Sequence, residues 1–156
     1  MIYHFTIYNR NGACLFHEKW HTGKTVNYSD PEEEKRLLFG LIFSLKEFVQ
    51  KIAPVAQTDP FSADHATTPH SDGLQRYQTK SYTCHHYETP SGLRFILFTD
   101  NNAGDLTTVL KYIYSHYYID FVVTNPLSNV NSTKAITSQL FRTQVKQYLE
   151  NLPCFR

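Results

Sequence analysis

The stretch IYHFTIYNRNGACLFHEKW, residues 2–20, decides how the fold begins. Residues 2–8 are rich in β-branched and aromatic side chains, which favour extended strands. Asn11-Gly12 follows, and this dipeptide is a strong hairpin signal because both residues tolerate positive φ angles. The strand pattern then resumes over residues 13–20. The chain is therefore predicted to begin with a β-hairpin.

A long helix is predicted next, from Pro31 to about Ile52. Asp30 is the candidate N-cap, Pro31 suits the first helical position, and Glu33 has the spacing of a capping box. The acidic run Glu32–Glu34 also lies at the positive end of the helix dipole. Compensation of the dipole explains these three carboxylates better than a metal site does.

Most apolar side chains of this helix fall on one stripe at 100° per residue, which we expect to face the core. The stripe consists of Leu37, Leu38, Leu41, Ile42, Leu45, Phe48, Val49 and Ile52. Phe39 and Phe43 lie one turn apart on the nearly opposite side, beside Lys46 and Gln50. Two large rings on an outer face require a cover. A partner protein is the favoured cover, and another element of the same domain is the alternative.

Residues 53–73 contain Pro54, Pro60, Pro69 and Gly73 and show no periodicity. An irregular segment of this length is unusual inside a compact domain and is either functional or disordered. We expect a flexible inserted loop within a single domain that spans residues 1–156.

Three strands are predicted after this loop, over residues 74–80, 82–88 and 93–99. The last of them is apolar on both faces after Arg94, which is typical of a central strand covered on two sides. We expect it to pair with residues 2–8, as the one parallel pairing of the sheet.

Two helices are predicted at the C-terminal end. The first carries a core stripe, and if it extends to Val123, then Tyr112, Ile119 and Val123 lie off that stripe, so that the helix is contacted on two sides. The stripe consists of Leu106, Val109, Leu110, Ile113, Tyr117 and Phe121. The final helix starts near Thr137 or Ser138. The order ββαβββαα predicts an α+β sandwich with a five-stranded, mainly antiparallel sheet, one helix on one face and two on the other.

The composition excludes several function classes. The chain has 156 residues, 15% aromatic residues and a formal net charge of +1. This charge provides no field for nucleic acid, and the tyrosines are not interleaved with Lys or Arg as stacking surfaces for single strands require. The sequence has no Gly-rich phosphate loop, nucleophile elbow or HExxH motif, so we predict that the chain is not an enzyme. Its aromatic surface instead resembles that of protein contacts.

A metal centre is not expected. Cys84, His85 and His86 form the densest group of possible ligands, but His85 points to the opposite face of a strand from the other two. Cys14 and His17 also differ in parity, whereas tetrahedral zinc needs about four convergent ligands. We predict no cofactor and no metal.

Several segments carry a resemblance to a known family. The turn Tyr8–Gly12 with Trp20, the Glu-rich helix start, LFGLIFSL at 38–45 and HYETPSGL at 86–93 occur in order. Four shorter segments follow: Thr99-Asp100, Tyr112-Ile113-Tyr114, Asn125-Pro126-Leu127 and Leu140-Phe141. Together they resemble the subunit 1 family of the TRAPP vesicle-tethering complex, and they cover most of the chain except residues 53–73. The resemblance implies a longin/profilin-like fold, which agrees with the predicted element order.

The resemblance also implies a function. It suggests a non-catalytic scaffold subunit that sits beside a second longin subunit and subunit 3. The assembly would form a platform for nucleotide exchange on a Rab GTPase of the early secretory pathway, at endoplasmic reticulum and Golgi membranes. The partner-binding candidates are Phe39, Phe43, Lys46, Gln50, Tyr112, Ile119 and Val123. The alternative is the small longin chain of a clathrin-type adaptor complex or another longin interaction module.

Overall fold

A five-stranded sheet forms the centre of the protein, with strand order β2-β1-β5-β4-β3. The computed structural model describes residues 1–20, 30–53, 73–127 and 134–155. The strands are β1 (Ile2–Tyr8), β2 (Cys14–Lys19), β3 (Arg76–Gln78), β4 (Thr83–Glu88) and β5 (Arg94–Thr99). The four helical segments are α1 (Pro31–Ile52), α2 (Thr107–Tyr112), the π-helix η1 (Ile113–Val123) and α3 (Gln139–Glu150). The predicted loop at 53–73 lies outside the described residues except for its two ends, so its flexibility stays a prediction.

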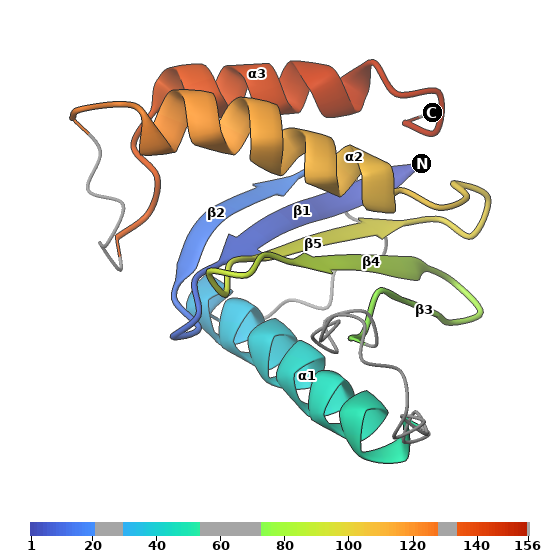
Figure 1. Ribbon diagram of the computed structural model, residues 1–156. Coiled ribbons are helices and arrows are strands. Elements are labelled where there is room, and N and C mark those ends of the chain that lie inside the picture. Colours follow the sequence, from blue (N-terminus) through green and yellow to red (C-terminus); the bar gives the residue numbers. More distant parts are fainter. Residues whose placement is uncertain (21–29, 54–72, 128–133, 156) are drawn as a thin grey trace, which may run out of the picture.

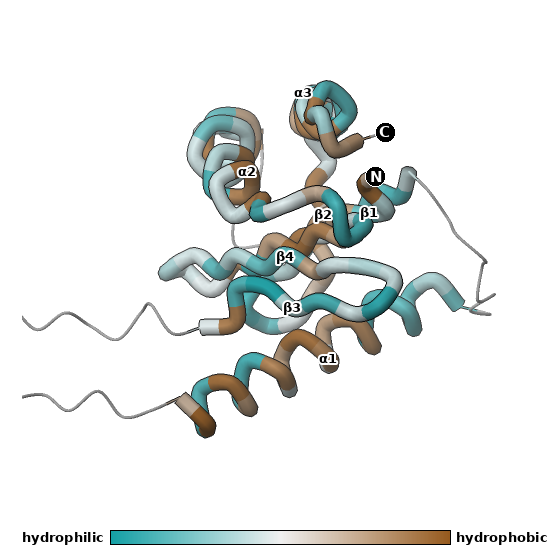
Figure 2. The backbone as a smooth tube through the Cα atoms, turned by 90° about the vertical axis from the view of Figure 1, so that its right-hand side faces the viewer, coloured by the Kyte–Doolittle hydropathy of each residue, from teal (hydrophilic) through white to brown (hydrophobic). Residues whose placement is uncertain are grey.

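The helices cover the sheet as predicted. Helix α1 packs on one face, and α2, η1 and α3 pack on the other (Figures 1 and 2). The element order ββαβββαα and the α+β class are confirmed, and the arrangement is that of a longin-type domain. No helix among the described residues is long and apolar enough to cross a membrane.

The predicted parallel pairing of β1 with β5 is wrong. These strands are antiparallel, with Ile2 opposite Thr99 and Tyr8 opposite Arg94. All the other strand pairs are antiparallel too. These pairings require β3 to run in the same direction as β2, so the connection through α1 returns the chain to the end of the sheet where β2 began. Two further reversals then leave β5 antiparallel to β1.

Local signals in the sequence fix the ends of the first elements. The Asn9 side-chain oxygen accepts hydrogen bonds from the backbone N–H groups of Asn11 (3.0 Å) and Ala13 (2.9 Å), and Gly12 adopts a φ of 85°. Asp30 caps α1, although its carboxylate accepts from the N–H of Glu32 (2.9 Å) and not from that of Glu33. The predicted hairpin and helix start are both confirmed.

The sheet separates two apolar cores. The larger one fills the space between the sheet and the layer of α2, η1 and α3. It consists of Ile2, Phe5, Ile7, Leu15, Phe16, Phe95, Leu97, Leu106, Leu110, Ile113, Tyr118, Val122, Phe141, Val145 and Leu149. The smaller one lies on the α1 side and consists of Tyr8, Ile42, Leu74, Cys84, Ile96 and Phe98. The α1 layer is therefore attached through far fewer buried side chains than the opposite layer.

The second predicted helix changes type partway along its length. From Ile113 to Val123 it is a π-helix, in which Thr124 N–H donates to the carbonyl of Ile119, five residues earlier (3.0 Å). Such a bond encloses one residue more than the bond of an α-helix does. The positions that face the core are therefore shifted by one residue along the sequence. Tyr118 and Val122 are buried, whereas the expected core residues Tyr117 and Phe121 are only half-buried. Long π-helices are rare, and periodicity at 3.6 residues per turn does not predict them.

Candidate protein-interaction site

Helix α1 is rotated relative to the predicted stripe. It faces the sheet through Ile42, with four half-buried neighbours: Leu38, Phe39, Leu45 and Val49. Two contacts help to set this orientation. The Tyr8 hydroxyl donates to the Lys35 carbonyl (2.8 Å), and Lys46 Nζ donates to Glu88 Oε2 (2.7 Å).

Half of the predicted core stripe is consequently exposed to solvent. Exposure ranges from 43% at Leu41 to 62% at Ile52. We call this surface the Leu41 flank, and it consists of Leu37, Leu41, Phe48 and Ile52. The prediction that these residues face the core is wrong, because the apolar arc of α1 is wider than the part of the helix that the sheet contacts. Figure 2 shows that hydrophobic residues recur along α1 after its hydrophilic N-terminal end.

The opposite edge of α1 carries the predicted partner-binding residues Phe39, Phe43, Lys46 and Gln50, and we call it the Phe43 flank. Phe43 and Gln50 are exposed, so they lie on an outer face as expected, and their role in partner binding stays a prediction. Phe39 is not on the outer face: its ring lies 5.5 Å from that of Tyr8, and a Cβ added at Gly12 would meet it at 2.8 Å. The hairpin turn therefore already covers Phe39, whereas the neighbouring Phe43 ring, at 6.2 Å, remains 43% exposed.

Arg94 is not among the predicted site residues, but it connects this flank to the sheet. Its side chain is only 7% exposed, and its guanidinium lies over the rings of Phe39 (4.9 Å) and Phe43 (5.9 Å). Its Nε is 3.7 Å from Glu88 Oε2, which is an ion pair but too long for a hydrogen bond. Arg94 Nε and Nη1 are buried, and among the described residues they have no hydrogen-bond partner. One feature of the sequence could have indicated this role: Arg94 is a charged residue at the start of a strand that is otherwise apolar on both faces.

Tyr112, Ile119 and Val123 belong to the other helical layer and are not brought near the Phe43 flank. Tyr112 stacks on His116 (4.1 Å) and on Tyr148 of α3 (5.1 Å), but stays 40% exposed. Val123 is equally exposed and Ile119 is half-buried. The predicted site residues thus form two separate surfaces on opposite faces of the sheet.

The histidines and cysteines of the sheet do not converge. Cys84 lies in the core beneath α1, whereas His85 points to the other face and contacts Thr99 Oγ1 (3.1 Å), as the strand parity predicts. Burial raises the pKa of Cys84 to about 12 and lowers that of His85 to about 4. In the described ranges, no three His, Cys, Asp or Glu side chains are placed to hold a metal ion.

Comparisons with known proteins show which family the chain is similar to. The model of the Sybindin-like family matches residues 2–152. The chain is 35% identical over 154 residues to trafficking protein particle complex subunit 1 of Homo sapiens, covering 99% of this chain and 95% of that protein. It is 33% identical over 155 residues to the subunit 1 of Dictyostelium discoideum, covering 99% of both. A shorter match, 29% over 80 residues, links it to trafficking protein particle complex subunit 4 of Pongo abelii, covering 51% of this chain and 35% of that protein.

Proposed function

Because this chain belongs to the Sybindin-like family, we propose that it is a non-catalytic scaffold subunit of a trafficking protein particle (TRAPP) complex. Near-complete coverage by relatives named subunit 1 supports this role over that of a clathrin-adaptor chain. The partial match to subunit 4 supports the idea that the assembly also contains a second chain of related fold.

The proposal includes a place of action. The assembly acts on the cytoplasmic face of cis-Golgi and endoplasmic reticulum membranes, in transport between them. There this chain sits beside the second longin subunit and subunit 3, and together they form the platform on which a Rab GTPase exchanges its nucleotide. Membrane association of the chain is peripheral and comes through the complex.

The exposed apolar side chains of α1 are the observation that carries the proposal. One helix presents Phe43 on one flank and Leu37, Leu41, Phe48 and Ile52 on the other, all at least 43% exposed. Large exposed apolar surfaces mark protein contacts. The cores of such contacts are enriched in aromatic side chains and poor in charge. We propose that a neighbouring subunit covers α1, and that the Phe43 flank is part of the contact.

Substitution of Phe43 with serine tests this contact. We expect the affinity of the chain for its neighbouring TRAPP subunits to fall at least tenfold, because buried interface aromatics commonly contribute more than about 1.4 kcal/mol. The free energy of unfolding of the free chain should change by less than about 1 kcal/mol, since the ring is already exposed. Titration of purified chain against the remaining co-purified subunits, with urea unfolding alongside, measures both quantities.

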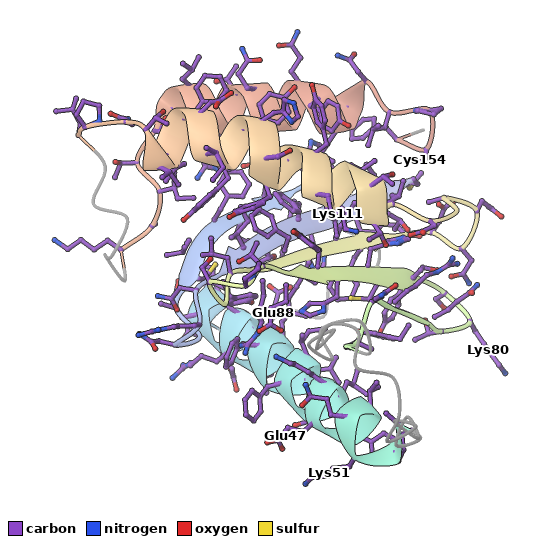
Figure 3. All side chains as sticks on the ribbon, viewed as in Figure 1. Glu47, Lys51, Lys80, Glu88, Lys111 and Cys154 are labelled. Carbon is purple, nitrogen blue, oxygen red and sulfur yellow. The ribbon has the colours of Figure 1, made fainter. Side chains whose placement is uncertain are left out.

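The matched control is Lys80→Ser, an exposed residue in the turn between β3 and β4, outside the proposed contact, whose side chain points away from the protein (Figure 3). Phe39 is left unchanged because its ring supports the hairpin turn, so its removal would also damage the fold. Assembly of the Phe43 variant at wild-type affinity would rule out the Phe43 flank as a contact.

The surface around Tyr112 is a second candidate contact. If a subunit covers Tyr112, Ile119 and Val123, the amide hydrogens of residues 107–123 should exchange more slowly in the assembled complex than in the free chain. Hydrogen exchange followed by mass spectrometry compares the two states, with α1, which the proposed contact also protects, as the positive reference. Equal exchange in both states would remove this surface from the contact.

A further inference from the structure

We propose that the Phe43 flank accepts an acidic segment of the neighbouring subunit, whose carboxylate pairs with Lys46 while Glu88 closes on Arg94. An apolar side chain adjacent to that carboxylate would cover Phe43. This inference rests on the proposed function, and it specifies the chemistry of the partner.

The two cations beside Phe43 do not each have a carboxylate of their own. Lys46 and Arg94 share one carboxylate, that of Glu88. Its Oε2 accepts from Lys46 at 2.7 Å but stays 3.7 Å from Arg94. Two positive charges therefore share one negative charge, and a second carboxylate at Lys46 would leave Glu88 to Arg94.

Of these two cations, Arg94 is the residue that lacks hydrogen-bond acceptors among the described residues. A buried donor without an acceptor carries a desolvation cost, and the cost is larger when the donor is charged. Contact with the faces of Phe39 and Phe43 offsets part of this cost by cation–π attraction. Within the part of the chain that the structure describes, two of its nitrogens still have no acceptor. Any rearrangement that brings a carboxylate within hydrogen-bonding distance therefore releases free energy.

Geometry indicates how a partner could reach this buried group. Arg94 itself is covered, but Lys46 and Glu88 are 24% and 23% exposed at the rim. Figure 3 shows Glu88 between the sheet and α1. A partner carboxylate on Lys46 would free Glu88 Oε2, which needs to approach Arg94 by only about 0.8 Å to reach a hydrogen-bonding distance of about 2.9 Å. Each cation would then have its own carboxylate.

Two methionine substitutions test the inference. Lys46→Met removes the rim cation, and Arg94→Met replaces the buried cation with an apolar side chain of similar length. We expect each to lower affinity for the co-purified neighbouring subunits about tenfold or more, and Lys46→Met also to weaken the dependence of affinity on salt. We expect Arg94→Met to leave the free chain as stable as the wild type or more so, because apolar replacements of buried ions are often neutral or stabilising. A merely structural role for Arg94 would lower stability and affinity together.

Lys80→Met is the matched control, since Lys80 is exposed in the turn between β3 and β4 and points away from the protein (Figure 3). Wild-type affinity of both test variants, alongside a weakened Phe43→Ser, would overturn the inference and leave the proposed function intact. Failure of the wild-type chain to bind the subunits at all would overturn both. Binding to phosphatidylserine vesicles that is lost in Lys46→Met would assign the surface to lipid and also overturn the inference.

Discussion

Replacing Phe95 with alanine is expected to lower the free energy of unfolding by about 3–5 kcal/mol. Phe95 is fully buried on the central strand β5. Its ring lies within 6.3 Å of the rings of Phe5, Tyr87, Tyr114 and Tyr118, so it joins β1, β4 and η1 in the larger core. Truncation would leave a cavity. The four surrounding rings belong to three different elements, so they cannot move together to fill it.

Equilibrium unfolding in urea measures this loss, and Phe48→Ala provides the matched control. Phe48 is 60% exposed on α1, so the same chemical change should cost less than about 1 kcal/mol there. Comparable losses for the two variants would contradict the assignment of the main core to the layer of α2, η1 and α3.

Stability should also decline as the pH falls below about 6.5. Burial lowers the pKa of His4 to about 3 and that of His85 to about 4, and it also lowers the pKa values of His17 and His86. Between these values and about 6.5 the unfolded chain binds protons that the folded chain does not. The free energy of unfolding therefore rises with pH across this range, by up to about 1.4 kcal/mol per pH unit for each histidine.

Urea unfolding at pH 5.0, 5.75 and 6.5 measures this slope in a range where most carboxylates remain ionised. His85→Gln should flatten the slope, because glutamine can still bond to Thr99 but does not titrate. His116→Gln makes the same substitution at an exposed position on η1 and is the matched control. A slope that His85→Gln does not alter would contradict the proposed role of His85.

Much of the fold could be predicted because its signals are local. Asn11-Gly12 specifies the first turn, Asp30-Pro31 specifies the start of α1, and the apolar run after Arg94 identifies β5 as a central strand. The direction of β5 relative to β1 could not be predicted in the same way. It depends on the path of the chain through α1, which no turn motif encodes.

The site was predicted less well, because it depends on which part of each helix the sheet contacts. Periodicity identified the apolar arc of α1 but not its rotation, so Phe39 was assigned to the outside and Leu41 to the core. Arg94 was missed because its role depends on Glu88 and on Phe39 and Phe43, which only the folded chain brings together. In η1, a change of hydrogen-bond type moved the inward positions from Tyr117 to Tyr118.

The sparse burial of α1 has a consequence for the supply of subunits. Of its 22 residues, Ile42 is the one that is fully buried. Under the proposed docking, partner binding therefore contributes to the stability of this layer by mass action, adding about 2.7 kcal/mol when the free partner is at 100 times its Kd. Chain made in excess of its partners would lack that increment and unfold more often, which exposes it to proteolysis. The amount of this subunit would then follow the amount of its partners, without any dedicated regulator.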